Sequence, residues 1–198
     1  MSACADSGRT PSSLHSSAVD VLTGWHTTDP EQDSLRHALL AFLAARPDAC
    51  QRACVPGHIT ASALVLDARG TRTLLTLHPR FGRWLQLGGH CEDSDTDIHA
   101  AALREATEES GIAGLTIDPN LAALHVHPVT CSLGVPTRHL DMQFLVRAPS
   151  GAEIIRSDES LDLRWWPLDA LPEGTDFGLA QLAGVAVRRG AAPQMSVE

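Results

Sequence analysis

The sequence predicts an α/β fold in which one mixed β-sheet carries helices on its faces, preceded by a helical extension. Its 198 residues are 43% hydrophobic and 20% charged, which is typical of one globular domain of ordinary size plus an extension. Strand-type stretches dominate the middle of the chain, and helical patterns follow the third stretch and stand near the C-terminal end. The stretches expected as strands are 57–67, 71–78, 84–87, 115–117, 121–129, 140–147 and 164–168, and the last helix is expected at 176–189.

The chain before residue 57 is expected to form a tail and a helical extension. Residues 1–17 are rich in small and polar side chains, which is typical of a disordered tail. Within the extension at 18–56, Asp29-Pro30-Glu31 indicates a helix start, because aspartate caps helices and proline suits the first turn. The domain itself is expected at 57–190, with a second tail at 191–198. An apolar stripe on the expected helix should dock on this domain or on a second subunit, and its members are Leu35, Leu39, Leu40, Phe42 and Leu43.

The charge and the cysteines limit the partners and the compartment. The net charge is −9 and no lysine is present, so the chain is poorly suited to grip long nucleic acid or an anionic membrane. No apolar run approaches the roughly 20 residues of a membrane span, and the N-terminal sequence lacks the pattern of a signal peptide. The 5 cysteines include no CxxC pair, which favours reduced thiols. We therefore expect a cytoplasmic protein.

One stretch, 87–112, concentrates the residues suited to chemistry. It opens with two glycines, passes through an acidic loop and enters a helix expected from about residue 96 to residue 110. At about 100° per residue, Glu105, Glu108 and Glu109 fall within roughly a third of the helix circumference. Carboxylates crowded on one face repel each other unless a cation lies among them. Because Mg²⁺ prefers carboxylate oxygens and also holds substrate phosphates, the stretch predicts a phosphate-handling metal site.

The segment REATEESGI at 104–112 resembles the end of the Nudix box, Gx5Ex7REUxEExGU, in which U is a bulky aliphatic residue. The first half of the box departs from this pattern. Asp95 stands in place of the glutamate, and eight rather than seven residues then lead to Arg104. The resemblance covers about 57–171. It implies a Nudix-like α/β/α sandwich with a mixed sheet, and a hydrolase that acts on a diphosphate bond.

The resemblance also implies which residues bind metal and which catalyse. The implied ligands of Mg²⁺ or Mn²⁺ are the Gly88 carbonyl and the carboxylates of Glu105, Glu108 and Glu109. Nudix enzymes often add a carboxylate from a loop shortly before a strand with tryptophan. Glu159 matches that placement, with Asp158 as the alternative. The catalytic candidates are therefore Glu105, Glu108 and Glu159, and the sequence leaves open which of them activates water.

Four residues of the box are expected to be structural. Gly89 belongs to a tight turn, and Gly111 ends the helix. Asp95 stands where a helix N-cap belongs. Arg104 is expected to point away from the acidic face and to pair with Asp95 or Glu92.

A histidine group lies outside the box. His125 and His127 alternate on an expected strand and therefore face one side, and His139 and Asp141 repeat this spacing on the next strand. Hairpin pairing would bring all four together. They would then serve either as ligands of a second metal such as Zn²⁺ or as hydrogen-bonding partners of a substrate or of one another.

Two residues just before the box are candidates for substrate contact. Arg83 and Trp84 stand where a nucleobase or a phosphate would be contacted, although a core position for Trp84 is at least as good an interpretation.

The leading functional hypothesis is a metal-dependent pyrophosphohydrolase that cleaves a diphosphate, typically of a nucleoside, linked to another moiety. One alternative is a catalytically silent Nudix fold that only binds a nucleotide. Another is an isomerase of isopentenyl-diphosphate type, which uses a cysteine, a glutamate and a histidine-bound metal and for which Cys91 would be the cysteine. A small-molecule diphosphate is the expected partner, and a homodimer is expected for this fold.

Overall fold

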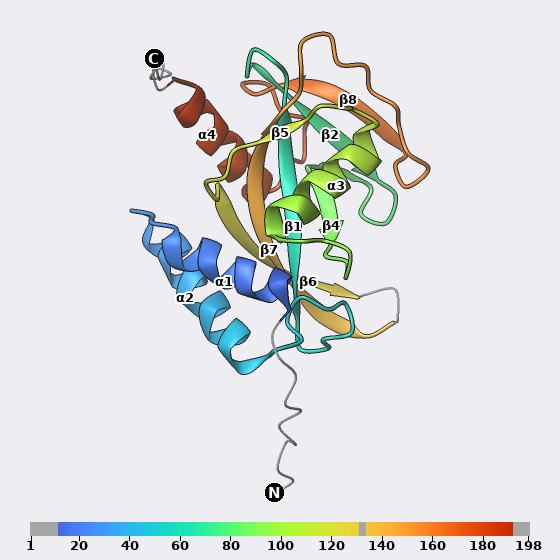
Figure 1. Ribbon diagram of the computed structural model, residues 1–198. Coiled ribbons are helices and arrows are strands. Elements are labelled where there is room, and N and C mark those ends of the chain that lie inside the picture. Colours follow the sequence, from blue (N-terminus) through green and yellow to red (C-terminus); the bar gives the residue numbers. More distant parts are fainter. Residues whose placement is uncertain (1–11, 131–133, 192–198) are drawn as a thin grey trace, which may run out of the picture.

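The computed structural model describes residues 12–130 and 134–191. Its centre is β1 (His58–Leu66), which is buried along its whole length in an eight-stranded sheet (Figure 1). On one side β1 pairs in parallel with β7 (Pro136–Arg147) over nine residue pairs, from His58 with His139 to Leu66 with Arg147. On the other side the first half of β1 pairs antiparallel with β4 (Leu87–His90).

The remaining strands extend this centre in both directions. The end of β1 pairs with β2 (Arg72–His78), which in turn carries β3 (Arg83–Leu85) and β8 (Asp162–Pro167). Beyond β7 lie β5 (Thr116–Ile117) and β6 (Ala123–Thr130), both antiparallel to it. The sheet therefore mixes one parallel pairing with several antiparallel ones, which confirms the predicted mixed sheet.

Helices cover both faces of the sheet because the side chains of β1 alternate between them. Val65 packs in a cluster with residues of α3 (Ile98–Ser110). Leu64 and Leu66 pack in a different cluster with residues of α4 (Phe177–Ala191). Both faces of the central strand are apolar, as expected for a strand between two helical layers. The α/β/α sandwich is thus confirmed.

The N-terminal extension consists of α1 (Ser13–Gly24) and α2 (Pro30–Ala45), which lie together beside the sheet (Figure 1). As predicted, Asp29 caps α2, accepting hydrogen bonds from the backbone N–H groups of Glu31 and Gln32. The tail predicted at 1–17 overlaps the first helix. Residues 13–17 belong to α1, which begins there because the Ser12 hydroxyl accepts the backbone N–H of His15. Residues 1–11 and 192–198 lie outside the described part of the chain.

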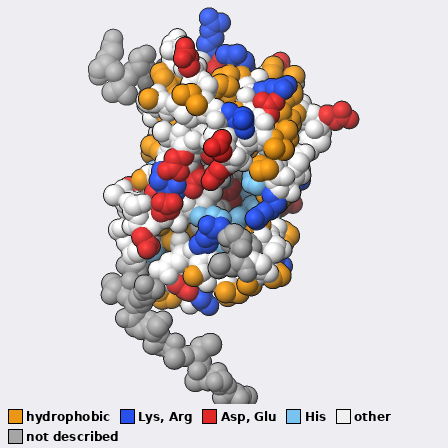
Figure 2. Space-filling view, turned by 90° about the vertical axis from the view of Figure 1, so that its right-hand side faces the viewer, with side chains coloured by type: hydrophobic (Ala, Val, Ile, Leu, Met, Phe, Trp, Pro, Cys, Tyr) orange, Lys and Arg blue, Asp and Glu red, His pale blue; other side chains and the backbone are white. Residues whose placement is uncertain are grey.

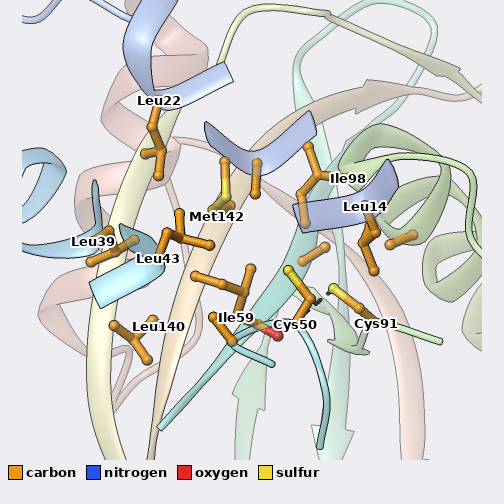
Figure 3. Close-up of a cluster of buried hydrophobic side chains, with 14 of the residues drawn as sticks. Leu14, Leu22, Leu39, Leu43, Cys50, Ile59, Cys91, Ile98, Leu140 and Met142 are labelled. Carbon is orange, nitrogen blue, oxygen red and sulfur yellow. Dashed lines mark hydrogen bonds between the residues drawn. The ribbon is translucent and has the colours of Figure 1, made fainter. Parts of the chain in front are cut away.

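The extension docks on the domain through an apolar cluster and several polar contacts. Leucines of α1 and α2 pack with residues of β1, β7 and α3 in one cluster (Figure 3). The side-chain amide of Gln32 donates to the Leu124 carbonyl over 3.0 Å and accepts the Leu124 N–H over 2.7 Å. The Ser17 hydroxyl accepts the backbone N–H of Ile98, at the start of α3. None of the helices in the described residues has the length and apolarity needed to traverse a bilayer.

Candidate active site

A cavity of about 580 Å³ opens between α3 and β4 on one side and the ends of β1, β2, β6 and β7 on the other. In the space-filling view, acidic side chains gather along one side of a hollow, and histidine and basic side chains lie in it and around it (Figure 2). The ionisable residues that line the cavity are Glu92, Glu105, Glu108, Glu109, Asp141, Glu159, Arg52, Arg80, Arg104, His78, His90, His127 and His139.

Two glycines of β4 allow close approaches on either side of this strand. Gly88 has φ +143°, and a Cβ there would lie 2.5 Å from the Ser62 Cα on the neighbouring strand. A Cβ on Gly89 would lie 2.9 Å from Oε2 of Glu105. The backbone N–H of Gly88 donates to Oε2 of Glu109 over 3.0 Å. Gly89 therefore lets the Glu105 carboxylate of α3 lie directly against β4, whereas Gly88 lets β4 approach β1 closely.

Burial gives these two carboxylates unusual acidities in the absence of a cation. Burial raises the pKa of Glu105 to about 7, with the negative charges of Glu108 and Glu159 adding to the rise and Arg104 opposing it. Glu109 is only 9% exposed. Burial raises its pKa to about 8. The hydrogen bond from the Gly88 N–H opposes this rise, and the negative charges of Glu105 and Glu159 add to it. Buried carboxylates that repel each other in this way form a set of oxygen donors that fits a hard divalent cation.

The two outer carboxylates differ from this buried pair. The Glu108 side chain is 59% exposed at the mouth of the cavity. Glu159 is exposed and lines the same cavity, where its charge acts on both buried glutamates. Asp158, the predicted alternative to Glu159, is not among the described lining residues.

Arg104 occupies a different position from the one predicted. It pairs with Asp95, as expected, through Nε to Oδ1 at 2.9 Å and Nη2 to Oδ2 at 3.1 Å. However, it does not point away from the acidic face, because Nη1 also donates to Glu105 and Glu108. Glu108 is within reach of the guanidinium because it follows Arg104 by one helical turn on α3.

The predicted helix cap also needs correction. Asp95 does not cap α3, because its carboxylate is engaged by Arg104 and by the backbone N–H of Glu92. The cap is Asp97, which accepts the backbone N–H of Ala100 over 2.9 Å. Gly111 ends the helix with φ +67°, and a Cβ there would lie 2.6 Å from the Cβ of Ile155.

Arg83 and Trp84, predicted to contact substrate, are not among the described residues that line the cavity. Arg83 forms an ion pair with Asp176 at 3.6 Å. Trp84 packs edge-on against Trp166 in the cluster beneath α4, the core position that was the alternative interpretation. The cavity instead contains Arg52 and Arg80, which were not predicted because no sequence motif distinguishes them from other loop arginines.

The predicted histidine group is only partly assembled. The register pairs His125 with Asp141 and His127 with His139, as expected. The His125 ring, however, lies against Gly178 of α4. The Asp141 carboxylate is occupied by the hydroxyls of Thr60 and Ser62 and by the side-chain amide of Gln143. These contacts argue against a metal site made of the four predicted residues.

Besides His127, whose ring centroid lies 5.1 Å away, His139 meets two histidines that were not predicted as partners. Its ring centroid lies 5.0 Å from that of His58 and 5.0 Å from that of His90. Burial lowers the pKa of His139 to about 3 and that of His90 to about 4, and it lowers the pKa of His58 as well. All three rings are therefore neutral at pH 7.

Cys91 is buried in the apolar cluster beneath α1, next to Cys50 (Figure 3). Its thiol donates to the Ile59 carbonyl over 3.7 Å, and burial raises its pKa well above the usual value. Cys91 is not among the described residues that line the cavity. These contacts are unsuited to a catalytic thiol, so they argue against the isomerase alternative.

The fold and the carboxylate-bearing helix are those of a hydrolase that acts on diphosphate bonds. The NUDIX domain family matches residues 56–183, more than half of the chain, and the protein belongs to this family. No curated protein sequence matches the chain.

Solved structures of Nudix hydrolases have the same fold. A Nudix-family hydrolase from Clostridium perfringens has a TM-score of 0.53 at 23% identity, covering 67% of this chain and 97% of that one. A C. elegans Ap4A hydrolase has a TM-score of 0.52 at 21% identity, covering 66% of this chain and 96% of that one. The E. coli dihydroneopterin triphosphate pyrophosphohydrolase has a TM-score of 0.51 at 21% identity, covering 63% of this chain and 91% of that one. At these identities the similarity establishes the fold.

Proposed function

We propose that the protein is a pyrophosphohydrolase that requires Mg²⁺ or Mn²⁺ and cleaves a nucleoside diphosphate linked to another moiety. One observation carries this proposal: Glu105, Glu108 and Glu109 of α3 converge with Glu159 on a single cavity. Of these carboxylates, Glu105 and Glu109 are largely buried. Arg104 donates to Glu105 but also to Asp95, so its single positive charge only partly neutralises the buried negative charge.

The donor set supports a hard cation at this point. Glu105 and Glu109 lie against β4, and we assign them, with Glu108 and the Gly88 carbonyl, as the metal ligands. A divalent cation held there would neutralise charge on phosphate oxygens and would lower the pKa of a water molecule. Carboxylate oxygens are the ligands that Mg²⁺ and Mn²⁺ prefer.

The protein's own residues supply orientation and proton transfer. Arg104 fixes the loop after β4 by donating to the His90 carbonyl and to Asp95. Glu108 and Glu159 are exposed at the cavity and can exchange protons with bulk water, which suits the general base. Comparing the pH–rate profiles of Glu108→Gln and Glu159→Gln identifies the base, since its loss removes the acidic limb of the profile.

Other cavity residues support an anionic substrate that carries a ring. Arg52 and Arg80 bring positive charge to a cavity otherwise rich in carboxylates, where phosphate oxygens need it. His78 and Phe81 lie with their ring centroids 4.7 Å apart and both line the cavity. This aromatic pair offers a stacking surface for a nucleobase.

The test is phosphate release from a panel of nucleoside diphosphate derivatives, with Mg²⁺ or Mn²⁺ added to metal-free protein. The Glu109→Gln variant should lose nearly all metal-dependent turnover and keep its far-ultraviolet circular dichroism spectrum. The matched control is Glu153→Gln, which changes an exposed glutamate outside the cavity and should keep full activity. Full turnover by Glu109→Gln would refute the assignment.

The silent nucleotide-binding alternative makes a different prediction in the same experiment. The wild-type protein would bind a nucleotide tightly in calorimetry and release no phosphate from any member of the panel. The one-residue-longer loop before α3 is the feature that favours this alternative. A homodimer and a cytoplasmic location stay predictions, which light scattering and cell fractionation test.

A further inference from the structure

Three histidines from adjacent strands meet beside the carboxylate site. His58 begins β1, His90 ends β4 and His139 lies in β7, and the register places His58 opposite His139 and His90 opposite Thr60. One ring nitrogen from each residue lies within 4.8 Å of the other two. The His58 and His90 ring centroids are also 5.0 Å apart. Three strands of the sheet thus hold three imidazoles in one compact group.

The hydrogen bonding of His58 leaves a lone pair in the middle of this group. His58 is only 1% exposed, and its Nδ1–H donates to the Cys54 carbonyl over 3.3 Å. That bond fixes the tautomer, so Nε2 carries no hydrogen and can only accept. Within the described residues, neither Nε2 of His58 nor Nε2 of His139 has a hydrogen-bond partner, although both atoms are buried. Buried polar atoms are rarely left unsatisfied, so these two nitrogens point to a missing ligand.

We propose that His58, His90 and His139 bind a divalent transition-metal ion of borderline softness, with Zn²⁺ as the first candidate. Neutral imidazole is a preferred ligand of such ions, whereas Mg²⁺ prefers oxygen. A metal-binding histidine normally donates its second ring N–H to a carbonyl or carboxylate, as His58 does to Cys54. The proposal is independent of the proposed hydrolysis.

The position of the group indicates what else this ion would bind. His90 and His139 line the same cavity as the carboxylates of α3, whereas His58 closes the group from the protein interior. Zinc with three protein ligands keeps a fourth position for water or substrate. That position opens toward the cavity here, so it would hold water or an oxygen or nitrogen atom of a ligand bound beside the carboxylates.

Calorimetric titration of metal-free, full-length protein with Zn²⁺ tests the proposal, with Mg²⁺ in large excess to occupy the carboxylates. We expect one Zn²⁺ per chain in the wild type and an affinity lower by roughly tenfold or more in His90→Gln and in His139→Gln. His125→Gln, which removes a histidine of β6 that faces α4, and Glu109→Gln should both keep the wild-type affinity. The proposal would be overturned if the wild type bound no Zn²⁺, or if His90→Gln and His139→Gln bound Zn²⁺ with the wild-type affinity. Loss of binding in Glu109→Gln would overturn it as well.

A second measurement needs no variant. Co²⁺ added to metal-free wild-type protein in excess Mg²⁺ should give the intense visible absorption of a four- or five-coordinate imidazole site, and one equivalent of Zn²⁺ should abolish it. The weak spectrum of octahedral Co²⁺ would contradict a three-histidine site even if the histidine variants fail to fold.

Discussion

Arg104 and Asp95 form a paired interaction in which two nitrogens of the guanidinium donate to the two oxygens of one carboxylate, over 2.9 and 3.1 Å. The Asp95 side chain is only 4% exposed, and it also accepts the backbone N–H of Glu92. Hydrogen bonding to Asp95 is the largest of the effects that raise the pKa of Arg104 above its already high value. The pair therefore ties the loop after β4 to α3, although that loop is one residue longer than the family pattern.

Replacing Asp95 by Asn should weaken this tie. The substitution keeps the shape but removes the negative charge beside a largely buried guanidinium, so we expect the free energy of unfolding to fall by about 2 kcal/mol. Urea denaturation measures the change. Asp93→Asn, an exposed substitution in the same loop, should stay within about 0.5 kcal/mol of the wild type. Equal stabilities of the two variants would show that the pair contributes little.

The stability of the metal-free protein should depend on pH through Glu105 and Glu109. Their pKa values are raised from 4.5 to about 7 and about 8, so the folded state holds protons that the unfolded state has already lost. The free energy of unfolding therefore falls as pH rises through these values. The buried histidines act oppositely, since their lowered pKa values favour the folded state as pH rises toward 6.5. The carboxylate effect is thus isolated between about pH 6.5 and about pH 8.

Urea denaturation across that window measures the effect. Glu109→Gln should show a flatter dependence, and Mg²⁺ should flatten the wild-type curve because it stabilises the charged carboxylates. A wild-type stability that rises between these pH values would contradict the assignment of raised pKa values.

Gly111 should be the less replaceable of two glycines with similar backbone conformations. Gly111 has φ +67° and Gly114 has φ +76°, so alanine at either position costs about 1 to 2 kcal/mol of backbone strain. A Cβ at Gly111 would also lie 2.6 Å from the Ile155 Cβ, whereas at Gly114 its nearest neighbour is 3.8 Å away. We expect Gly111→Ala to lose at least about 1 kcal/mol more than Gly114→Ala in thermal or urea unfolding. Equal losses would mean that the segment carrying Ile155 adjusts freely.

Gln32 should contribute to stability beyond its place on α2. Its amide satisfies both the N–H and the carbonyl of Leu124, so Gln32→Ala leaves two buried backbone groups without this partner. We expect a loss of about 2 kcal/mol in the free energy of unfolding. Gln181→Ala removes only a 3.4 Å contact to Asp29 and should change little. If Gln32→Ala is equally mild, water replaces the amide at β6.

The sequence predicted the elements of the fold better than their pairing. Alternating apolar residues in the middle of the chain and the cap at Asp29 identified most strands and the start of α2. Pairing of β1 with β4 on one side and β7 on the other is a long-range choice that local alternation does not encode. For this reason the predicted partners of His139 were incomplete: His127 lies beside it as predicted, but His58 and His90 are far from it in sequence and meet it only through that pairing.

The box shows the same division. The placement of Glu105, Glu108 and Glu109 on one helix face followed from helical periodicity alone, and all three line the cavity. The helix cap was predicted at Asp95 instead of Asp97, because an aspartate can cap a helix at either position and local sequence does not distinguish them. The choice is decided by Arg104, which engages Asp95 and leaves Asp97 to begin the helix.

The bond from Ile98 to the Ser17 hydroxyl has a consequence for how fragments of this protein behave. The family-matched segment starts at residue 56, yet the first turn of the acid-bearing helix is completed by a side chain from α1. A fragment trimmed to that segment would expose the apolar underside of α3 and release the end that positions its carboxylates. We therefore predict that a fragment starting at residue 56 is less stable than the full chain, because α1 and α2 pack against the domain in one apolar cluster.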